Sequence, residues 1–147
     1  MAVFDLLKKE HDKYRDMFRK VMEEKEKSRL FDELNRELDI HMEGEEEYVY
    51  PETQKAGLDE ETLESIEEHH VAKVLQAELE MMSGDEENFM AKVKVFRENV
   101  EHHLDEEEQQ LFPQARKKIS EGKQEQMEDK YRKLKQRQES EEEEEGE

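Results

Sequence analysis

Two segments of the sequence carry a histidine, a glutamate four residues later, and then an aromatic residue followed by a proline. They read HMEGEEEYVYP at residues 41–51 and HLDEEEQQLFP at residues 103–113. Because residues four apart lie on one face of a helix, each segment directs one imidazole and one carboxylate to the same side. Imidazole nitrogens and carboxylate oxygens are common metal ligands, so the chemistry that this spacing predicts is metal binding.

Both histidines continue a stripe of apolar residues at intervals of three and four. The stripes consist of Phe31, Leu34 and Leu38 before His41, and of Phe89, Val93, Phe96 and Val100 before His103. Such a stripe is the buried face of an amphipathic helix, so the histidines and the glutamates that follow them, Glu45 and Glu107, occupy core positions. A buried carboxylate without a partner is strongly destabilising. Two such pairs on facing helices therefore predict a cation between them.

The elements that must position these residues are four amphipathic helices. Apolar periodicity predicts them at about residues 3–26, 28–48, 59–82 and 85–107, the last with an extension to about residue 118. The breaks between them are short and strand signals are absent, which favours an all-α, up-down-up-down four-helix bundle. Pro51 removes a backbone donor, so we expect the second helix to end or kink near it.

The first and third helices each add a histidine. His11 lies on a stripe with Tyr14, Met17 and Val21. In the third helix His69 and His70 are adjacent, so only one can point inward, and periodicity alone fits either. The spacing after His11 recurs after His69, at Ala72, Leu75 and Leu79. This recurrence indicates a duplicated helix pair and favours His69.

The predicted metal ligands are thus four imidazoles and two carboxylates: His11, His41, Glu45, His69, His103 and Glu107. The chain has no cysteine, and a nitrogen and oxygen ligand set suits Fe, Mn, Zn or Ni. Six ligands are more than one tetrahedral zinc needs. Two carboxylates in a two-fold arrangement are suited to bridging two metals, which leaves room for a small ligand such as O₂.

The chain's 147 residues predict one domain, although 46% are charged and the net charge is −20, which approaches the composition of disordered chains. Part of this bias lies at the C-terminus. We expect a bundle over residues 1–120 and a polar, acidic C-terminal extension over residues 121–147, partly helical or disordered. The run of glutamates at residues 141–145 should have little persistent structure.

The acidity argues against nucleic acid or an anionic membrane surface as partner, because both would be repelled. No apolar run is long enough for a membrane span, and the N-terminus has no signal-peptide core. The expected location is therefore the cytoplasm.

The sequence resembles the hemerythrin-like, or HHE cation-binding, family over roughly residues 3–118. The two His-x-x-x-Glu segments with their aromatic-Pro pairs carry the resemblance, together with the EEHH and EHH contexts around His69 and His103. The resemblance implies that the six residues ligate two iron ions in a carboxylate- or oxo-bridged di-iron centre, with Glu45 and Glu107 bridging; Mn or Zn is an alternative. It also favours His69 over His70. Oxygen-carrying members bind O₂ at an open iron position.

The sequence departs from the oxygen-carrier pattern in one respect, because carriers add a fifth histidine through an HxxxH motif on the third helix. Ser65 and Lys73 flank His69 at that distance, and Ile66 and Val74 flank His70. Water, Glu46 or Glu108 would then complete one metal. This places reversible O₂ carriage in question and favours sensing, iron handling or oxidase-type chemistry.

Three functional hypotheses follow. The leading one is a di-iron protein that binds or senses O₂ or iron without being a dedicated enzyme, with O₂, another small diatomic or peroxide as its ligand. The second is a di-iron oxidase, peroxidase or nitric-oxide-handling enzyme. The third is a metal-free, acidic helical interaction protein. A ferritin-like carboxylate site is rejected, because its Glu-x-x-His spacing occurs once, at Glu67 and His70, without a second copy.

Overall fold

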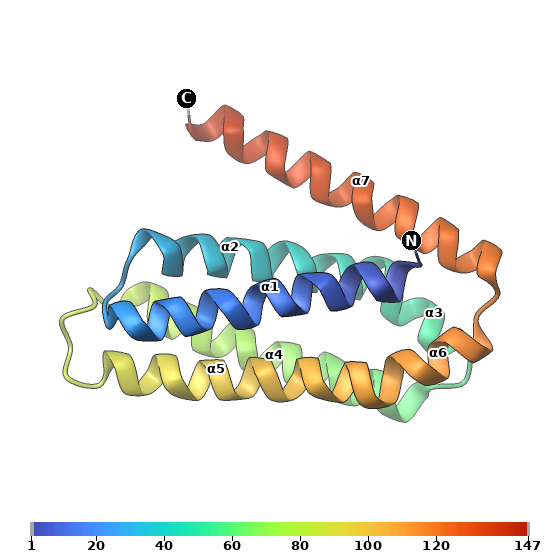
Figure 1. Cartoon of the computed structure of the whole chain (residues 1–147), viewed down its shortest axis with the longest axis horizontal. Helices are drawn as coiled ribbons and strands as arrows, with labels where there is room; N and C mark the ends of the chain where they lie inside the picture. The colour runs from blue at the N-terminus through green and yellow to red at the C-terminus, as the bar shows by residue number, and fades with distance from the viewer. Residues whose placement is uncertain (1, 147) are drawn as a thin grey trace.

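The computed structural model describes residues 2–146, with side chains described through residue 141. Four long helices run alternately up and down, as Figure 1 shows: α1 (Val3–Glu24), α2 (Arg29–Gly44), α4 (Asp59–Met81) and α5 (Phe89–Glu106). Single π-helical turns, η1 (Glu45–Val49) and η2 (Glu107–Leu111), extend α2 and α5. The short helices α3 (Tyr50–Lys55) and α6 (Phe112–Lys118) follow them, and α7 (Glu121–Gly146) ends the chain. The expected all-α, up-down-up-down bundle is confirmed.

Local chemistry explains where the helices begin and end. The Ser28 hydroxyl caps α2 by accepting a bond from the backbone N–H of Phe31 at 3.1 Å. After α1, Lys25 adopts a left-handed conformation, with φ of 57°, and its N–H returns to the carbonyl of Val21. Gly84, with φ of 102°, supplies the turn between α4 and α5. These breaks keep consecutive helices antiparallel and adjacent.

Two apolar clusters fill the interior. One contains Phe18, Phe31, Phe89 and Phe96 and occupies the end of the bundle where α1 meets α2. The other contains Phe4, Leu7, Val49, Leu111 and Phe112 and lies toward the opposite end. Along α1, α2 and α5 the predicted ligands fall between residues of the first cluster and residues of the second. The site is therefore enclosed by apolar side chains on both sides.

Each π turn lies directly before a proline. In η1 the N–H of Tyr50 bonds to the carbonyl of Glu45, five residues earlier, and in η2 Phe112 bonds to Glu107 in the same way. A proline ring clashes with the carbonyl four residues before it in a regular α-helix, and the wide turn relieves this clash. The chain thus passes Pro51 through a π turn instead of ending there. Because the turn absorbs one extra residue, Tyr50 shares a face with Glu45.

The helix α7 packs against α1, α2 and η1. Its three apolar residues, Met127, Tyr131 and Leu134, are 2%, 1% and 4% exposed, so they form the buried face of this helix. The sequence predicted a partly helical or disordered extension here, whereas the structure has one helix through residue 146, including the closing glutamates. Figure 1 shows α7 starting beside α6 and crossing over α2 toward the C-terminus. The boundary at residue 120 stays a prediction.

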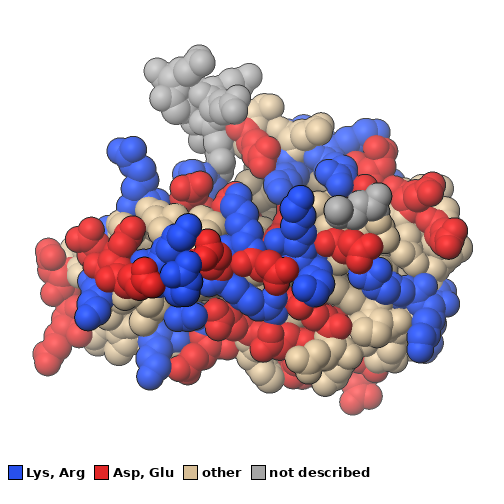
Figure 2. Space-filling model, viewed as in Figure 1, with Lys and Arg blue, Asp and Glu red and all other residues tan. Residues whose placement is uncertain are grey.

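The face of the molecule that Figure 2 draws carries charges of both signs. Figure 2 shows Lys and Arg side chains interspersed with Asp and Glu across this face, in keeping with the many ion pairs between neighbouring turns. Among residues 2–146, no helix is long and apolar enough to cross a membrane.

Candidate metal centre

The structure brings all six predicted ligands together in the middle of the bundle. They come from six elements and are at most 5% exposed: His11 on α1, His41 on α2, Glu45 on η1, His69 on α4, His103 on α5 and Glu107 on η2. The neighbouring residues His70 and His102 are exposed, so the inward histidine of α4 is His69. That these six coordinate a metal stays a prediction.

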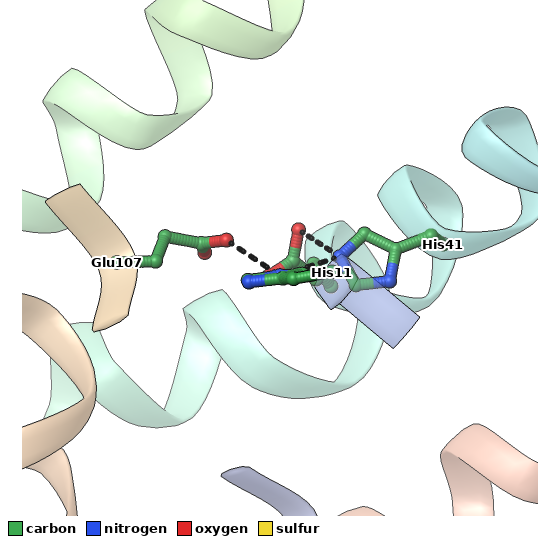
Figure 3. Close-up of side chains that lie close together, drawn as sticks. His11, His41 and Glu107 are labelled. Atoms are coloured by element: carbon green, nitrogen blue, oxygen red, sulfur yellow. Dashed lines mark hydrogen bonds and ion pairs between the residues drawn. The ribbon is translucent and has the colours of Figure 1, made fainter. Parts of the chain in front are cut away.

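His11 and His41 form the first half of the site. Their Nε2 atoms lie 3.3 Å apart, and the Nε2 of His41 lies 3.2 Å from Oε1 of Glu45. The Nε2 of His11 lies 3.5 Å from Oε1 of Glu107, which approaches from the opposite side, as Figure 3 shows. The four side chains surround a single point with donor atoms that all lie within 4.8 Å of one another.

His69 and His103 form the second half in the same way. Their Nε2 atoms lie 3.1 Å apart, and Oε1 of Glu45 lies 3.2 Å from the Nε2 of His69. Oε1 of Glu107 lies 3.3 Å from the Nε2 of His103. Each glutamate therefore contacts one imidazole of each half, which is the position that a bridging carboxylate requires.

A carboxylate lies against the outer nitrogen of every imidazole. The Nδ1 atom of His11 lies 2.9 Å from Glu108, and that of His41 lies 2.9 Å from Glu10. The Nδ1 atom of His69 lies 2.9 Å from Glu46, and that of His103 lies 2.7 Å from Glu68. A carboxylate accepts, so each Nδ1–H donates and each Nε2 directs a lone pair into the site. Glu46 and Glu108, expected as possible metal ligands, instead hold imidazoles from outside.

This arrangement fits a cation better than it fits protons. Burial alone would lower the pKa of His41, but the charge of Glu45 and the hydrogen bonds that the imidazole donates to Glu10 and Glu45 raise the pKa to about 10. With both inner nitrogens protonated, two N–H groups would face each other across 3.3 Å. Oε2 of Glu45 and Oε1 of Glu107 are buried without a hydrogen-bond partner among the described residues. Metal ions would satisfy the facing lone pairs and both orphaned oxygens.

Tyr50 belongs to the site, although there was no strong reason in the sequence to choose it over Tyr48 as a donor. Its hydroxyl donates to Oε2 of Glu107 at 2.8 Å and lies 3.1 Å and 3.4 Å from the Nε2 atoms of His69 and His103. It is thus a further oxygen among the donors of the second half, where a fifth histidine was lacking. The available signal was the aromatic-Pro pair itself, because Tyr50 precedes Pro51 five residues after Glu45.

The matching aromatic residue of the second segment is Phe112, which has no hydroxyl. Its ring stacks on His11, with centroids 5.7 Å apart and planes 27° apart. Tyr50 lies over His69 with centroids 5.2 Å apart. The duplicated segments therefore give the two halves the same scaffold but different polarity.

A small apolar cavity adjoins three of the imidazoles. Its volume is about 20 Å³, enough for one water-sized molecule. Its lining includes His41, His69 and His103, Asn99, and the apolar residues Leu38, Met42, Ala72, Phe96, Val100 and Leu104. Oδ1 of Asn99 is buried without a partner among the described residues. The site thus adjoins a mainly apolar recess that can hold one water-sized molecule.

Comparison with known proteins supports the same family. A crystal structure of a Hemerythrin HHE cation binding domain-containing protein, the Rv2633c homolog from Mycobacterium kansasii, is similar with a TM-score of 0.82 and 26% identity, covering 95% of this chain and 89% of that one. An uncharacterized hemerythrin-like protein of Schizosaccharomyces pombe is 36% identical over 89 residues, 58% of this chain and 43% of that protein. A DNA nickase of Nostoc sp. is 24% identical over 123 residues, 82% of this chain and 35% of that protein.

This chain spans less than half the length of those two curated relatives. The family model described as the Hemerythrin HHE cation binding domain matches residues 2–115, which contain all six predicted ligands and Tyr50. Because this model matches most of the chain and the matched segment contains a buried histidine and carboxylate cluster, the chain belongs to the hemerythrin HHE cation-binding family.

Proposed function

We propose that this protein holds two iron ions between its four helices and uses them to bind or sense O₂, or to sense iron. The observation that carries the proposal is the pair of facing imidazole couples, at 3.3 Å and 3.1 Å, joined by two buried carboxylates with orphaned oxygens. Four imidazoles and two carboxylates suit iron, and Mn or Zn would fit the same donors.

The two halves would hold one ion each. His11, His41, Glu45 and Glu107 surround the first position, and Glu45, His69 and His103 surround the second. Bound iron would supply Lewis acidity and one-electron chemistry at this point. The protein's own part is to keep each Nε2 aimed inward through the outer carboxylates and to place the Tyr50 hydroxyl among the donors of the second position.

The recess of about 20 Å³ supports a ligand of one or two heavy atoms. Its wall is formed mainly by apolar side chains, which suit a small neutral ligand. O₂ and peroxide are ligands of this size, so the recess supports that ligand class.

The proposal is tested by purifying the protein from its native host, measuring its metal content and recording an aerobic absorption spectrum. We expect about two iron ions per chain and visible bands that change when O₂ is removed and returned. Protein that retains no iron, or whose iron spectrum is indifferent to O₂, would refute iron-based O₂ binding.

A second candidate function is a peroxidase or oxidase at the same centre. The observation that favours it is Tyr50, because its phenol hydroxyl, bonded to Glu107, lies in the half of the site where a fifth histidine is lacking. Steady-state consumption of peroxide, O₂ or nitric oxide by the iron-loaded protein would distinguish turnover from stoichiometric binding.

A further inference from the structure

The four imidazoles share an arrangement that continues outward past their carboxylates. Each carboxylate is itself contacted by a basic side chain. These contacts are Arg15 to Glu108 at 2.7 Å, Lys135 to Glu10 at 2.6 Å, Lys73 to Glu46 at 2.8 Å and His102 to Glu68 at 3.7 Å. The same three-part chain of basic group, carboxylate and imidazole therefore occurs four times around the centre.

In three of these series of contacts all members belong to the bundle, whereas in the fourth the basic group does not. Arg15, Lys73 and His102 lie on α1, α4 and α5, which also carry ligands. For His41 the basic group is Lys135 of α7, outside the segment that the family model matches. Apart from His41 itself, no basic group of the bundle contacts Glu10 within hydrogen-bond distance among the described residues. The arrangement around His41 is thus complete only when α7 is docked.

Tyr131 of α7 adds a second contact to the same carboxylate. Its hydroxyl donates to Oε1 of Glu10 and lies 3.1 Å from the Nδ1 of His41. The Glu10 side chain is 6% exposed, whereas those of Glu46, Glu68 and Glu108 are 32%, 14% and 17% exposed. The difference arises because α7 covers Glu10. Its carboxylate has lost most of its water and depends on these protein donors.

The docking of α7 at this point is specific. The Tyr131 ring lies directly on Gly44, where a Cβ atom would come within 2.3 Å of the ring carbon Cε2. The matching position of the second segment is Glu106, so a glycine is needed only where α7 passes. Farther along, Gln138 donates to Glu43 at 3.1 Å. These contacts fix the rotation of α7 with Tyr131 and Lys135 facing Glu10.

We propose that α7 is part of the metal centre, and that Tyr131 and Lys135 are positioning residues that hold Glu10 against His41. This inference rests on the proposed function, because it concerns the ion that His41 would hold. Without the two donors, Glu10 is free to turn toward solvent, and the His41 ring loses the acceptor that fixes its tautomer and direction. The C-terminal segment then determines how tightly the first metal position is filled.

The test is a Co²⁺ titration of the metal-free, full-length protein in competition with a chelator, with the ligand-field spectrum recorded at each step. The variants are Tyr131→Phe, Lys135→Met and the double variant. Tyr14→Phe is the matched tyrosine control, since the Tyr14 ring also meets His41 edge-on, at 5.3 Å, while its hydroxyl donates to the Glu37 carbonyl. Lys133→Met is the matched lysine control, since Lys133 pairs with Asp129 in solvent.

We expect the double variant to weaken one of the two Co²⁺ dissociation constants roughly 10-fold or more, the usual effect of removing an outer partner of a ligand, with the other constant unchanged. The controls should bind Co²⁺ as the unmodified protein does. Lys135→Arg should also bind as the unmodified protein does, because it keeps the positive charge beside Glu10. In the metal-free protein, the His41 ring N–H signal in proton NMR should exchange faster in the double variant. This readout does not depend on metal.

If both constants and the His41 signal match those of the Lys133→Met control, the inference is overturned while the metal centre stands. An unmodified protein that binds no Co²⁺ would instead refute the metal centre itself. Circular dichroism establishes that each variant is folded. Should the double variant fail to fold, the comparison of Lys135→Met with Lys135→Arg decides, because the two differ in charge and keep the same aliphatic contact.

Discussion

The Tyr50 hydroxyl donates to Oε2 of Glu107 at 2.8 Å, across 57 residues of sequence. The bond joins the two duplicated segments, because the aromatic residue of the first reaches the carboxylate of the second. Phe112, the counterpart of Tyr50, cannot return such a bond and stacks on His11 instead. The two metal positions therefore have different donor sets despite a common scaffold.

Tyr50→Phe should alter the second metal position and leave the first nearly unchanged. The variant keeps the ring contact with His69 and removes the oxygen that lies 3.1 Å from its Nε2. We expect a changed visible spectrum of the iron-loaded protein. We also expect a loss of about 1.5–3 kcal/mol of stability in the metal-free protein, the range for a hydrogen bond to a charged group.

The control is Tyr48→Phe, two residues away on the half-buried side of the same turn. Spectra and melting curves of the two variants should differ. Identical spectra for the unmodified protein and both variants would show that the Tyr50 oxygen takes no part in the centre.

Metal removal should lower the melting temperature. A metal bound by the folded state alone stabilises that state by mass action, by about 2.7 kcal/mol when free metal is 100 times its Kd. Calorimetry before and after chelation, followed by restoration with Zn²⁺, measures the effect. A melting temperature that does not respond to chelation would favour the metal-free interaction protein.

The metal-free protein should lose stability on both sides of a window between pH 4.5 and pH 6.5. Burial opposes ionisation of Glu10, but bonds and charge from His41 and bonds from Lys135 and Tyr131 lower its pKa from 4.5 to about 2. The unfolded chain then binds more protons, so this contribution is lost as the pH falls from 4.5 toward 2. The pKa of His41 is raised from 6.5 to about 10, so its contribution is lost as the pH rises through that range.

Melting curves of metal-free protein across this pH range measure the loss of stability on the acid side and on the alkaline side. Glu10→Gln should flatten the acid limb, because an amide does not titrate there. Metal-loaded protein should lose less stability at alkaline pH, since the metal takes the place of the inner proton of His41. Equal alkaline losses with and without metal would contradict metal coordination by His41.

Gly44→Ala should displace α7. The added Cβ would lie 2.3 Å from the Tyr131 ring, so either the ring or the helix must move, at a cost of about 1–3 kcal/mol. The matched control is Gly122→Ala, where nothing lies within 4 Å and a helical alanine should stabilise by about 0.5 kcal/mol. Denaturant unfolding compares the two. Equal effects on stability would mean that α7 is not held against Gly44.

His69→Gln should remove one of the two metal ions, whereas His70→Gln should leave both. His69 is 2% exposed with its Nε2 in the site, and His70 is exposed on the other side of the same turn. Metal analysis after dialysis gives the result directly. Loss of metal from the His70 variant would overturn the assignment of α4.

The sequence was sufficient for the bundle and for the cluster of six side chains, because both follow from helical periodicity. His41 and Glu45 interrupt an apolar stripe, so their helical phase places them on the buried face of α2 and η1, however the neighbouring helices are arranged. The choice of His69 over His70 needed the internal duplication, since both residues fit an inward phase. Metal identity and number lie beyond periodicity, because the same donors serve several ions.

The contributions of Tyr50 and α7 were not predictable in the same way. A regular α-helix would place Tyr50 well away from the face of Glu45, and nothing in helical periodicity indicates a π turn; the proline alone suggested an end or kink. For α7, three apolar residues in a highly charged segment gave too little signal for a docked helix. Gly44, a glycine inside a helix where the second segment has Glu106, was the clue to a close approach.

The π turns also determine where the chain tolerates a change in length. Each contains one residue more than the α-helical turn that would connect the same flanks. Deleting the exposed Glu47 would convert η1 to an ordinary turn and leave Tyr50 directed at the centre, but the Pro51 ring would then clash with the carbonyl four residues before it. A single deletion between Leu38 and His41 would rotate every preceding residue relative to His41 by about 100° and break the register of α2. Shortening η1 by one residue thus preserves the register of the metal donors, at the cost of the proline clash, about 3 kcal/mol.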